Sequence, residues 1–281
     1  MDRTVRITTL VENTAAGRGL LGEHGLAFHI QVGRKTVLFD TGQGQVLKGN
    51  ARRLGIRLEL ANAIILSHGH YDHTGGVGGV LEAAPRAKVY AHPGAFEPKY
   101  ARNGDARARA VGMSLPNASK IRERPDQPVW TNGPTEIGSI LSVTGEIPRA
   151  TDFEDTGGEF FLDTECRQPD PLIDDQAIFF QSSHGTVVLL GCAHAGVINT
   201  LRYVTELTDG RPIHAVVGGM HLLNASPGRI YRTIEAIRRF DVDLLGPAHC
   251  TGMGAMTKLW TAFAGKCFPC TVGTTMEFKV P

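Results

Sequence analysis

The sequence lacks the features by which several broad classes of protein are recognised. Its 29 Lys and Arg residues nearly balance 28 Asp and Glu residues, so the formal net charge is only +1. A chain without a basic excess gives no reason to expect a nucleic acid or a membrane surface as its partner. No apolar run approaches the roughly 18 residues of a membrane span, and the opening residues, MDRTVRITTL, contain no apolar secretion signal.

Cysteine is scarce as well, and its spacing is irregular. The five cysteines are an odd number, which is typical of a reduced, cytoplasmic protein rather than of a disulfide framework. Cys267 and Cys270 form one C-x-x-C pair, but no second pair accompanies them to complete a zinc site. We therefore predict a cytoplasmic location and interpret this pair as core thiols, with a zinc or redox site as the alternative.

The most informative stretch is residues 66–76, which read LSHGHYDHTGG. An apolar run, residues 61–66, comes before it and predicts a buried strand, and a helix-like segment follows the glycine pair. The polar residues therefore belong in a loop at the C-terminal end of a strand, where α/β sheets place their sites. They are His68, His70, Asp72 and His73.

The spacing of these residues suits metal binding. In an extended loop, residues two apart point the same way, so His68 and His70 can hold one ion. The chain then turns into the helix, and Asp72 and His73 can face a second ion. Imidazole nitrogen and carboxylate oxygen suit zinc, manganese or iron.

The H-x-H-x-D-H motif resembles that of the metallo-β-lactamase superfamily. The resemblance extends over nearly the whole chain and implies a single α/β domain over residues 1–281, folded as a four-layer αββα sandwich. It implies two divalent ions, preferably Zn²⁺ and alternatively Mn²⁺ or Fe. The first would be held by His68, His70 and His194, and the second by Asp72, His73 and His249.

Other polar residues at predicted strand ends complete this site. Asp40 matches the residue that supports the metal loop in the superfamily, although it can equally cap a helix expected near residues 43–54. His221 follows a strand and can steady a leaving group or donate a hydrogen bond to a ligand. Asp72 is expected to orient the attacking water or to accept its proton, which makes Asp72 and His221 the candidate catalytic residues.

Two positions depart from the superfamily pattern. Glu146 stands where a ligating His is usual, so it can bind a hard ion, hydrogen-bond a ligand, or do neither. Cys192 stands where an Asp normally bridges the two ions, and it can bind as a thiolate or merely pack. Arg149 either holds a substrate anion or is an ordinary solvated Arg. Residues 94–127 are rich in Lys and Arg and predict either a solvated helical insertion or a lid for an anionic substrate.

Three functions remain open. The first is a two-ion hydrolase that activates water against a phosphoester or a related small anionic substrate. The segments GEIPR (145–149) and GCAHAGVINT (191–200) resemble a subgroup named after 7,8-dihydropterin-6-methyl-4-(β-D-ribofuranosyl)aminobenzene 5'-phosphate synthase. That resemblance implies the second, transfer of a dihydropterin pyrophosphate to an arylamine ribose phosphate. The third is a di-iron redox or sensory protein, and no feature predicts the oligomeric state.

Overall fold

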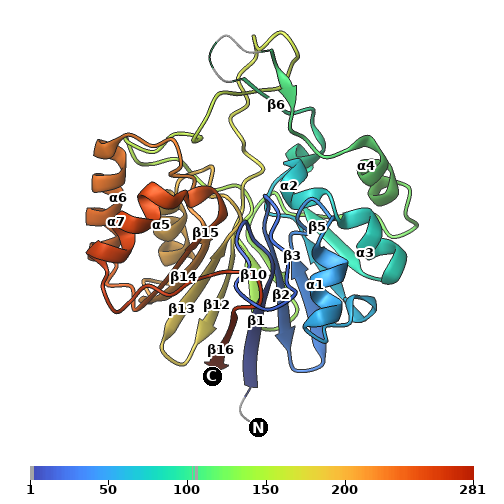
Figure 1. Cartoon of the computed structure of the whole chain (residues 1–281), viewed down its shortest axis with the longest axis horizontal. Coiled ribbons are helices and arrows are strands. Elements are labelled where there is room, and N and C mark those ends of the chain that lie inside the picture. The colour runs from blue at the N-terminus through green and yellow to red at the C-terminus, as the bar shows by residue number, and fades with distance from the viewer. Residues whose placement is uncertain (1–2, 103, 105–106) are drawn as a thin grey trace.

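The computed structural model describes residues 3–102, 104 and 107–281. Residues 1–2 of the expected domain, and residues 103, 105 and 106 of the expected lid, lie outside this range. Two β-sheets stand face to face in the centre of the molecule, and helices cover the outer face of each (Figure 1).

The first sheet has seven strands in the order β16-β1-β2-β3-β4-β5-β8. Its strands β3, β4, β5 and β8 are parallel, so their C-terminal ends meet at one edge. The bounds are β1 (Arg3–Val11), β2 (Ala27–Val32), β3 (Lys35–Phe39), β4 (Ala63–Ile65), β5 (Lys88–Ala91), β8 (Val129–Trp130) and β16 (Thr275–Val280).

The second sheet has six strands in the order β15-β14-β13-β12-β10-β9. Strands β13, β14 and β15 are parallel and end at the same edge as the parallel strands of the first sheet (Figure 1). The bounds are β9 (Thr135–Ile137), β10 (Leu141–Val143), β12 (Ile178–Ser182), β13 (Gly185–Leu190), β14 (Ile213–Gly219) and β15 (Leu244–Ala248).

Side chains along each strand point alternately to the two faces of its sheet, and the apolar ones form three layers. One face of each sheet contributes to the layer between the sheets, where the rings of Phe180 and Phe278 lie 5.8 Å apart. The outer faces pack against helices, which form two further apolar clusters. This arrangement confirms the α/β class and the four-layer αββα sandwich expected from the sequence.

The helices divide between the two outer layers (Figure 1). The first sheet is covered by α1 (Leu47–Arg53), α3 (Val77–Ala83) and α4 (Leu115–Arg122), and the second by α5 (Val197–Leu207), α6 (Pro227–Arg239) and α7 (Met253–Ala262). Short helical turns are η1 (Leu58–Leu60), α2 (Tyr71–Thr74), η2 (Pro93–Phe96) and η3 (His249–Thr251). None of the helices in the described residues has the length and apolarity needed to cross a membrane.

Helix α6 shows how local sequence produces these elements. Ser226 precedes it and accepts a hydrogen bond from the backbone N–H of Arg229 at 3.1 Å, which caps the helix start. The buried residues Ile230, Ile234 and Ile237 recur at helical spacing, so one face packs into the core of the second half.

A third, small sheet projects above the edge where the parallel strands end (Figure 1). Its strands are β6 (Tyr100–Ala101), β7 (Arg109–Ala110) and β11 (Phe160–Phe161). The sequence predicted only part of this feature, because β11 comes from a segment that reads as an acidic loop. The expected lid is also smaller than residues 94–127, since α4 packs beside α3 on the outer layer: Asn117 of α4 accepts a hydrogen bond from the Gly78 N–H at 3.2 Å.

Candidate metal centre

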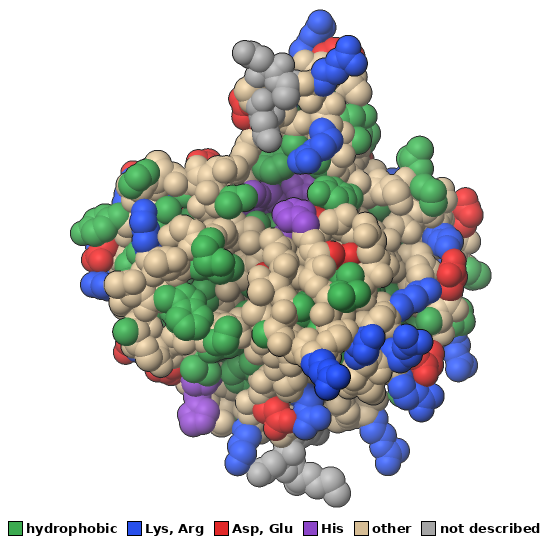
Figure 2. Space-filling model, viewed as in Figure 1, with side chains coloured by type: hydrophobic (Ala, Val, Ile, Leu, Met, Phe, Trp, Pro, Cys, Tyr) green, Lys and Arg blue, Asp and Glu red, His purple; other side chains and the backbone are tan. Residues whose placement is uncertain are grey.

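Histidine side chains gather in a hollow beneath the small sheet (Figure 2). The hollow is a cavity of about 480 Å³, lined by residues that follow β4, β13, β14 and β15. Four histidines at these strand ends line it: His70, His194, His221 and His249. The structure thus places together the ends that the sequence singled out.

The first ligand loop follows β4. The Nε2 atom of His68 and the Nδ1 atom of His70 lie 2.9 Å apart. The other ring nitrogen of His68 lies 2.8 Å from the hydroxyl of Ser67, which donates its own proton to the carboxylate of Asp40 at 2.7 Å. His68 therefore donates from Nδ1, and its Nε2 lone pair faces His70.

The second ligand loop follows β13 and carries Cys192 and His194. Ala193 between them has a positive φ of 56°, which turns the chain sharply at the strand end. The Nδ1 atom of His194 lies 2.8 Å from the carbonyl oxygen of Thr156, so this nitrogen donates. The Nε2 atom is buried and has no hydrogen-bond partner among the described residues.

His249 enters from the end of β15, also with a positive φ, 51°. Its Nδ1 atom lies 2.8 Å from the side-chain oxygen of Asn13 and therefore donates to it. Its Nε2 atom lies 3.3 Å from the Nε2 of His73 and 3.3 Å from the carboxylate of Asp72. The Nε2 lone pair of His249 is thus directed at Asp72 and His73.

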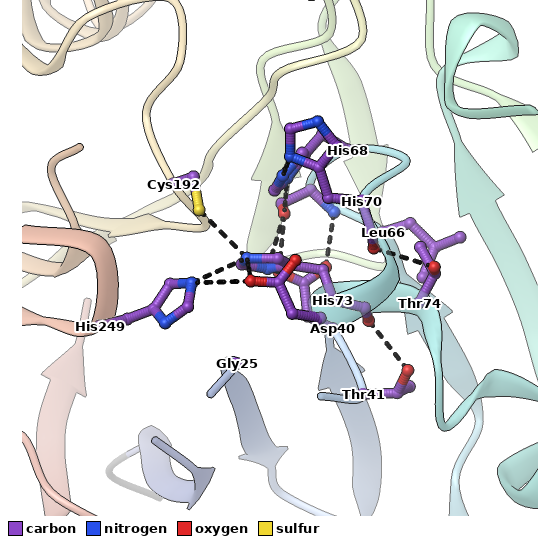
Figure 3. Close-up of polar contacts among 12 residues, drawn as sticks. Gly25, Asp40, Thr41, Leu66, His68, His70, His73, Thr74, Cys192 and His249 are labelled. Carbon is purple, nitrogen blue, oxygen red and sulfur yellow. Dashed lines mark hydrogen bonds and ion pairs between the residues drawn. The ribbon is translucent and has the colours of Figure 1, made fainter. Parts of the chain in front are cut away.

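Asp40 lies at the end of β3 and organises the first ligand loop (Figure 3). Its carboxylate accepts hydrogen bonds from the Ser67 N–H at 2.7 Å and from the His73 Nδ1–H at 2.6 Å. This directs the Nε2 atom of His73 away from Asp40, where it can bind a metal ion once its proton is displaced, as in the carboxylate–histidine pairs of metal sites. Asp40 caps no helix: α1 begins at Leu47, and Val46 occupies its N-cap position.

The donor atoms form two triads that share one sulfur. His68, Cys192 and His194 make one triad, and His73, Cys192 and His249 make the other, with donor atoms within 4.8 Å of one another in each. The Cys192 sulfur lies 3.1 Å from the Nε2 of His73 (Figure 3). Nitrogen and sulfur donors that converge in this way fit a pair of metal ions, which would displace the protons of His73 and Cys192 on binding.

Burial and charge set the protonation of these groups. Burial lowers the pKa of His70 and of His249 to about 4 each, and it also lowers the pKa of His68 and of His194 well below the ordinary value. These imidazoles are therefore neutral and able to bind metal. Burial would also lower the pKa of His73, but the carboxylates of Asp40 and Asp72 outweigh it and raise that pKa to about 9.

His221 lies beside the first triad at the end of β14. Its ring centroid is 4.2 Å from that of His194, and its Nδ1 is buried without a hydrogen-bond partner among the described residues. Burial lowers the pKa of His221 to about 3. The ring is neutral at neutral pH, so it is suited to hydrogen-bond a ligand rather than to act as a cationic acid.

Two of the sequence-predicted residues, Glu146 and Arg149, are exposed at the surface and do not line the cavity. The chain after β10 buries Ile147 and leaves Glu146 and Arg149 exposed on either side of it. The guanidinium of Arg149 donates to the carbonyl oxygen of Pro171 at 2.8 Å instead of facing the metal centre. Glu146 is likewise absent from the cavity lining, so the structure brings no glutamate to the position where the superfamily has a His.

The small sheet covers the cavity and supplies one of its cations. Arg109 of β7 is exposed and lines the cavity. The metal loop is bonded to the base of this sheet, since the Tyr71 N–H donates to the carbonyl oxygen of Val111 at 2.9 Å. The part of the expected lid that lies over the site is therefore the segment around β6 and β7.

The segment 174–176, expected only as a hairpin entry, supports both ligand loops. Asp174 accepts a hydrogen bond from the Gly69 N–H at 2.8 Å, and Asp175 accepts one from the Ala195 N–H at 2.8 Å. Gln176 donates to the carbonyl oxygen of Leu66 at 2.7 Å. Burial raises the pKa of Asp175 to about 7.

Sequence reasoning missed three groups that contact the donors: the Asn13 side chain, the Thr156 carbonyl and His24. His24 lies in the glycine-rich segment after β1, with its Nε2 atom 3.1 Å from the Asp72 carboxylate. The sequence does show a histidine between two glycines, Gly22 and Gly25, which could have marked it as a candidate. The spacing along the chain, however, does not indicate where such a loop packs.

The fold and this donor set define a class of metal-binding α/β sandwich, and sequence comparison assigns the family. The profile of the metallo-beta-lactamase superfamily matches residues 22–249. The chain belongs to that superfamily, as its H-x-H-x-D-H motif indicated.

Individual relatives cover almost the whole chain. An uncharacterized protein of Methanocaldococcus jannaschii is 32% identical over 90% of this chain and 93% of its own length. The 7,8-dihydropterin-6-methyl-4-(beta-D-ribofuranosyl)-aminobenzene-5'-phosphate synthase of the same organism is 28% identical over 89% of each chain. A solved structure, Tm1679, described as a metal-dependent hydrolase of the beta-lactamase superfamily, has a TM-score of 0.83 at 30% identity and covers 98% of this chain and 99% of its own.

Proposed function

We propose that this protein is a metal-dependent hydrolase that uses two divalent ions to cleave a phosphoester or a related anionic substrate. The observation that carries the proposal is the pair of donor triads that share Cys192 at the bottom of one cavity. The similarity to a solved metal-dependent hydrolase supports it. The five free cysteines are consistent with action in a reducing compartment such as the cytoplasm.

The donor set determines how the ions would be held. His68, His70 and His194 would hold the first ion, Asp72, His73 and His249 the second, and Cys192 lies within both triads. Nitrogen and sulfur donors favour Zn²⁺, with Mn²⁺ or Fe as alternatives. When bound, such a pair of ions supplies Lewis acidity and an activated water nucleophile.

The remaining chemistry belongs to side chains of this chain. Burial opposes ionisation of Asp72, but His73 and the neighbouring imidazoles outweigh it and hold the pKa of that carboxyl well below its usual range. Asp72 is thus a carboxylate that can orient the attacking water or accept its proton. His221, neutral and without a partner among the described residues, can donate a hydrogen bond to the leaving group.

Arg109 gives the site its preference for anions. It takes the role that the sequence assigned to Arg149, because it is the Arg of β7 that lines the cavity. A guanidinium is suited to phosphate oxygens, which it can bind with two parallel hydrogen bonds.

The test is a substrate screen with the metal-loaded protein, using phosphomonoesters and phosphodiesters beside a neutral lactone. Arg109→Ala should raise KM for the phosphoester about tenfold or more, as expected when a charge-assisted hydrogen bond is lost, and leave any lactone activity unchanged. Arg34→Ala, in the turn between β2 and β3, is the matched control. Metal-loaded protein that cleaves none of these esters would contradict the proposal.

A second function, transfer rather than hydrolysis, is supported by the relative named as a dihydropterin synthase. In that case an arylamine would attack the pterin substrate in place of water, and pyrophosphate would leave. Release of pyrophosphate that requires both substrates would favour transfer, whereas release with the pterin substrate alone would favour hydrolysis.

A further inference from the structure

His24 lies at the mouth of the cavity, next to the second group of metal-binding residues. Its Nε2 atom is 3.1 Å from the carboxylate of Asp72, and its ring centroid is 4.9 Å from that of His249. The donor atoms of His24, Asp72 and His249 lie within 4.8 Å of one another. About half of the His24 side chain (52%) is exposed, whereas Asp72 and His249 are buried.

The backbone around His24 is held firmly in this position. The carboxylate of Glu23 accepts hydrogen bonds from four successive backbone N–H groups, those of residues 43–46. On the other side, the Leu26 N–H donates to the carbonyl oxygen of Asp72 at 3.3 Å. Gly25 between them has a φ of 151°, and a Cβ there would lie 2.5 Å from that same carbonyl oxygen. These contacts hold a short loop against the backbone of Asp72, so the backbone of His24 is fixed next to the Asp72 carboxylate.

The spacing of the donor atoms matches the coordination sphere of a single ion. Metal–nitrogen and metal–oxygen bonds of about 2.0–2.1 Å place neighbouring donors about 3.0–3.4 Å apart. Asp72 lies 3.1 Å from His24 and 3.3 Å from His249, and His249 lies 3.3 Å from His73. The four groups form a continuous chain of donors at this spacing.

We propose that His24 is a direct ligand of the second ion and binds it through Nε2. This inference rests on the proposed two-ion site and adds a residue outside the H-x-H-x-D-H motif. Cys192 belongs to both donor triads, and the half-exposed His24 supplies a further donor beside Asp72 and His249.

The direct test is metal titration of His24→Ala by calorimetry, together with the visible spectrum of the cobalt-loaded protein. Loss of an outer hydrogen-bonding partner already costs about 10–100-fold in metal affinity, so loss of a ligand should weaken the second binding step by at least about tenfold. The first step should be unchanged, and the cobalt spectrum should report a changed coordination. His184→Ala, an exposed histidine in the turn between β12 and β13, is the matched control.

A second variant separates ligation from loss of folding. His24→Glu restores a donor atom of similar reach and should recover most of the affinity for the second ion, while thermal unfolding of the metal-free proteins checks that each variant folds. If His24→Ala binds two ions with wild-type affinity and spectrum, His24 is not a ligand, and the proposed function still stands. A wild-type protein that binds no metal would overturn the proposed function as well.

Discussion

Cys192 stands where the superfamily pattern leads one to expect a bridging Asp, and the structure places its sulfur in both donor triads. Burial raises the pKa of its thiol well above the ordinary value in the metal-free protein. A bound ion must therefore displace the thiol proton, as in other cysteine–metal sites. The replacement of a carboxylate by sulfur makes the site softer and favours zinc over magnesium or calcium.

Replacement of Cys192 by Ser should remove the thiolate-to-cobalt absorption band of the cobalt-loaded protein. It should also weaken metal binding at least about tenfold, because a hydroxyl is a poorer ligand than a thiolate. Cys250→Ser is the control, since its buried sulfur donates to the Cys192 carbonyl oxygen but belongs to neither triad. A band that persists in the Cys192 variant would show that the sulfur is not a ligand.

The C-x-x-C pair, expected to be core thiols, gives a pH prediction. Burial raises the pKa of Cys267 to about 11 and that of Cys270 to about 12. Because the thiolate is the reactive form, both should resist iodoacetamide at pH 8 in the folded protein and gain reactivity only as the pH rises towards these values. Peptide mass spectrometry would measure the labelling of each cysteine, with the urea-unfolded protein as the reactive control. Fast labelling of Cys270 at pH 8 would contradict this account.

At the scale of single residues, the sequence predicted those members of the site whose partners are close along the chain. His68, His70, Asp72 and His73 come together because their spacing in one loop brings them together. Asp40, His194 and His249 were recognised from their places at strand ends. The roles of Glu146 and Arg149 were left open and His24 was missed, because the paths of the loops that carry them depend on distant contacts, such as those of the Glu23 carboxylate with residues 43–46.

At the scale of elements, Lys99 connects the small sheet to the ligand loops. Its ammonium group lies 2.9 Å from the carboxylate of Asp170 and 2.9 Å from that of Asp174, and the Lys99 side chain is only 1% exposed. Asp174 in turn accepts the Gly69 N–H. A single buried cation thus fixes the segment before β6, the segment after β11 and the first ligand loop.

Lys99→Met should therefore lower the free energy of unfolding by about 3–5 kcal/mol, because it leaves two buried carboxylates without a counter-charge. Urea denaturation would measure the change, and metal affinity should fall with it. Lys120→Met is the control: this lysine of α4 pairs with Glu82 at the surface, where its side chain is 45% exposed, so its loss should matter far less. Equal effects of the two substitutions would contradict a structural role for the Lys99 cluster.

The main elements could be predicted from periodicity and turn signals. A helix that the sequence predicts after the GCAHAG segment forms as α5 (Val197–Leu207), and a hairpin that it predicts about residues 33–35 forms between β2 and β3. The sequence indicates the basic segment that carries β6 and β7 but not the small sheet itself, because its strands are two residues long and β11 comes from a distant segment. Such short strands carry no periodic signal of their own.

At the scale of the whole molecule, the position of the site follows from the topology. Each half repeats a parallel strand, a ligand loop and a helix, and the two sheets meet so that these ends share one edge. The layer order came from the resemblance to the superfamily, since periodicity alone indicates only an α/β protein. The two halves pack together through the central apolar layer, and this packing brings His68 of the first half and His194 of the second half into the same triad.

The central claim is that this edge holds two metal ions. Elemental analysis of protein purified without added metal, beside a His68→Ala variant, tests it most directly. We expect about two zinc or manganese ions per chain in the wild type and a clear loss in the variant. Two irons would instead favour redox chemistry, and a wild-type protein without metal, or equal metal in both proteins, would contradict the account.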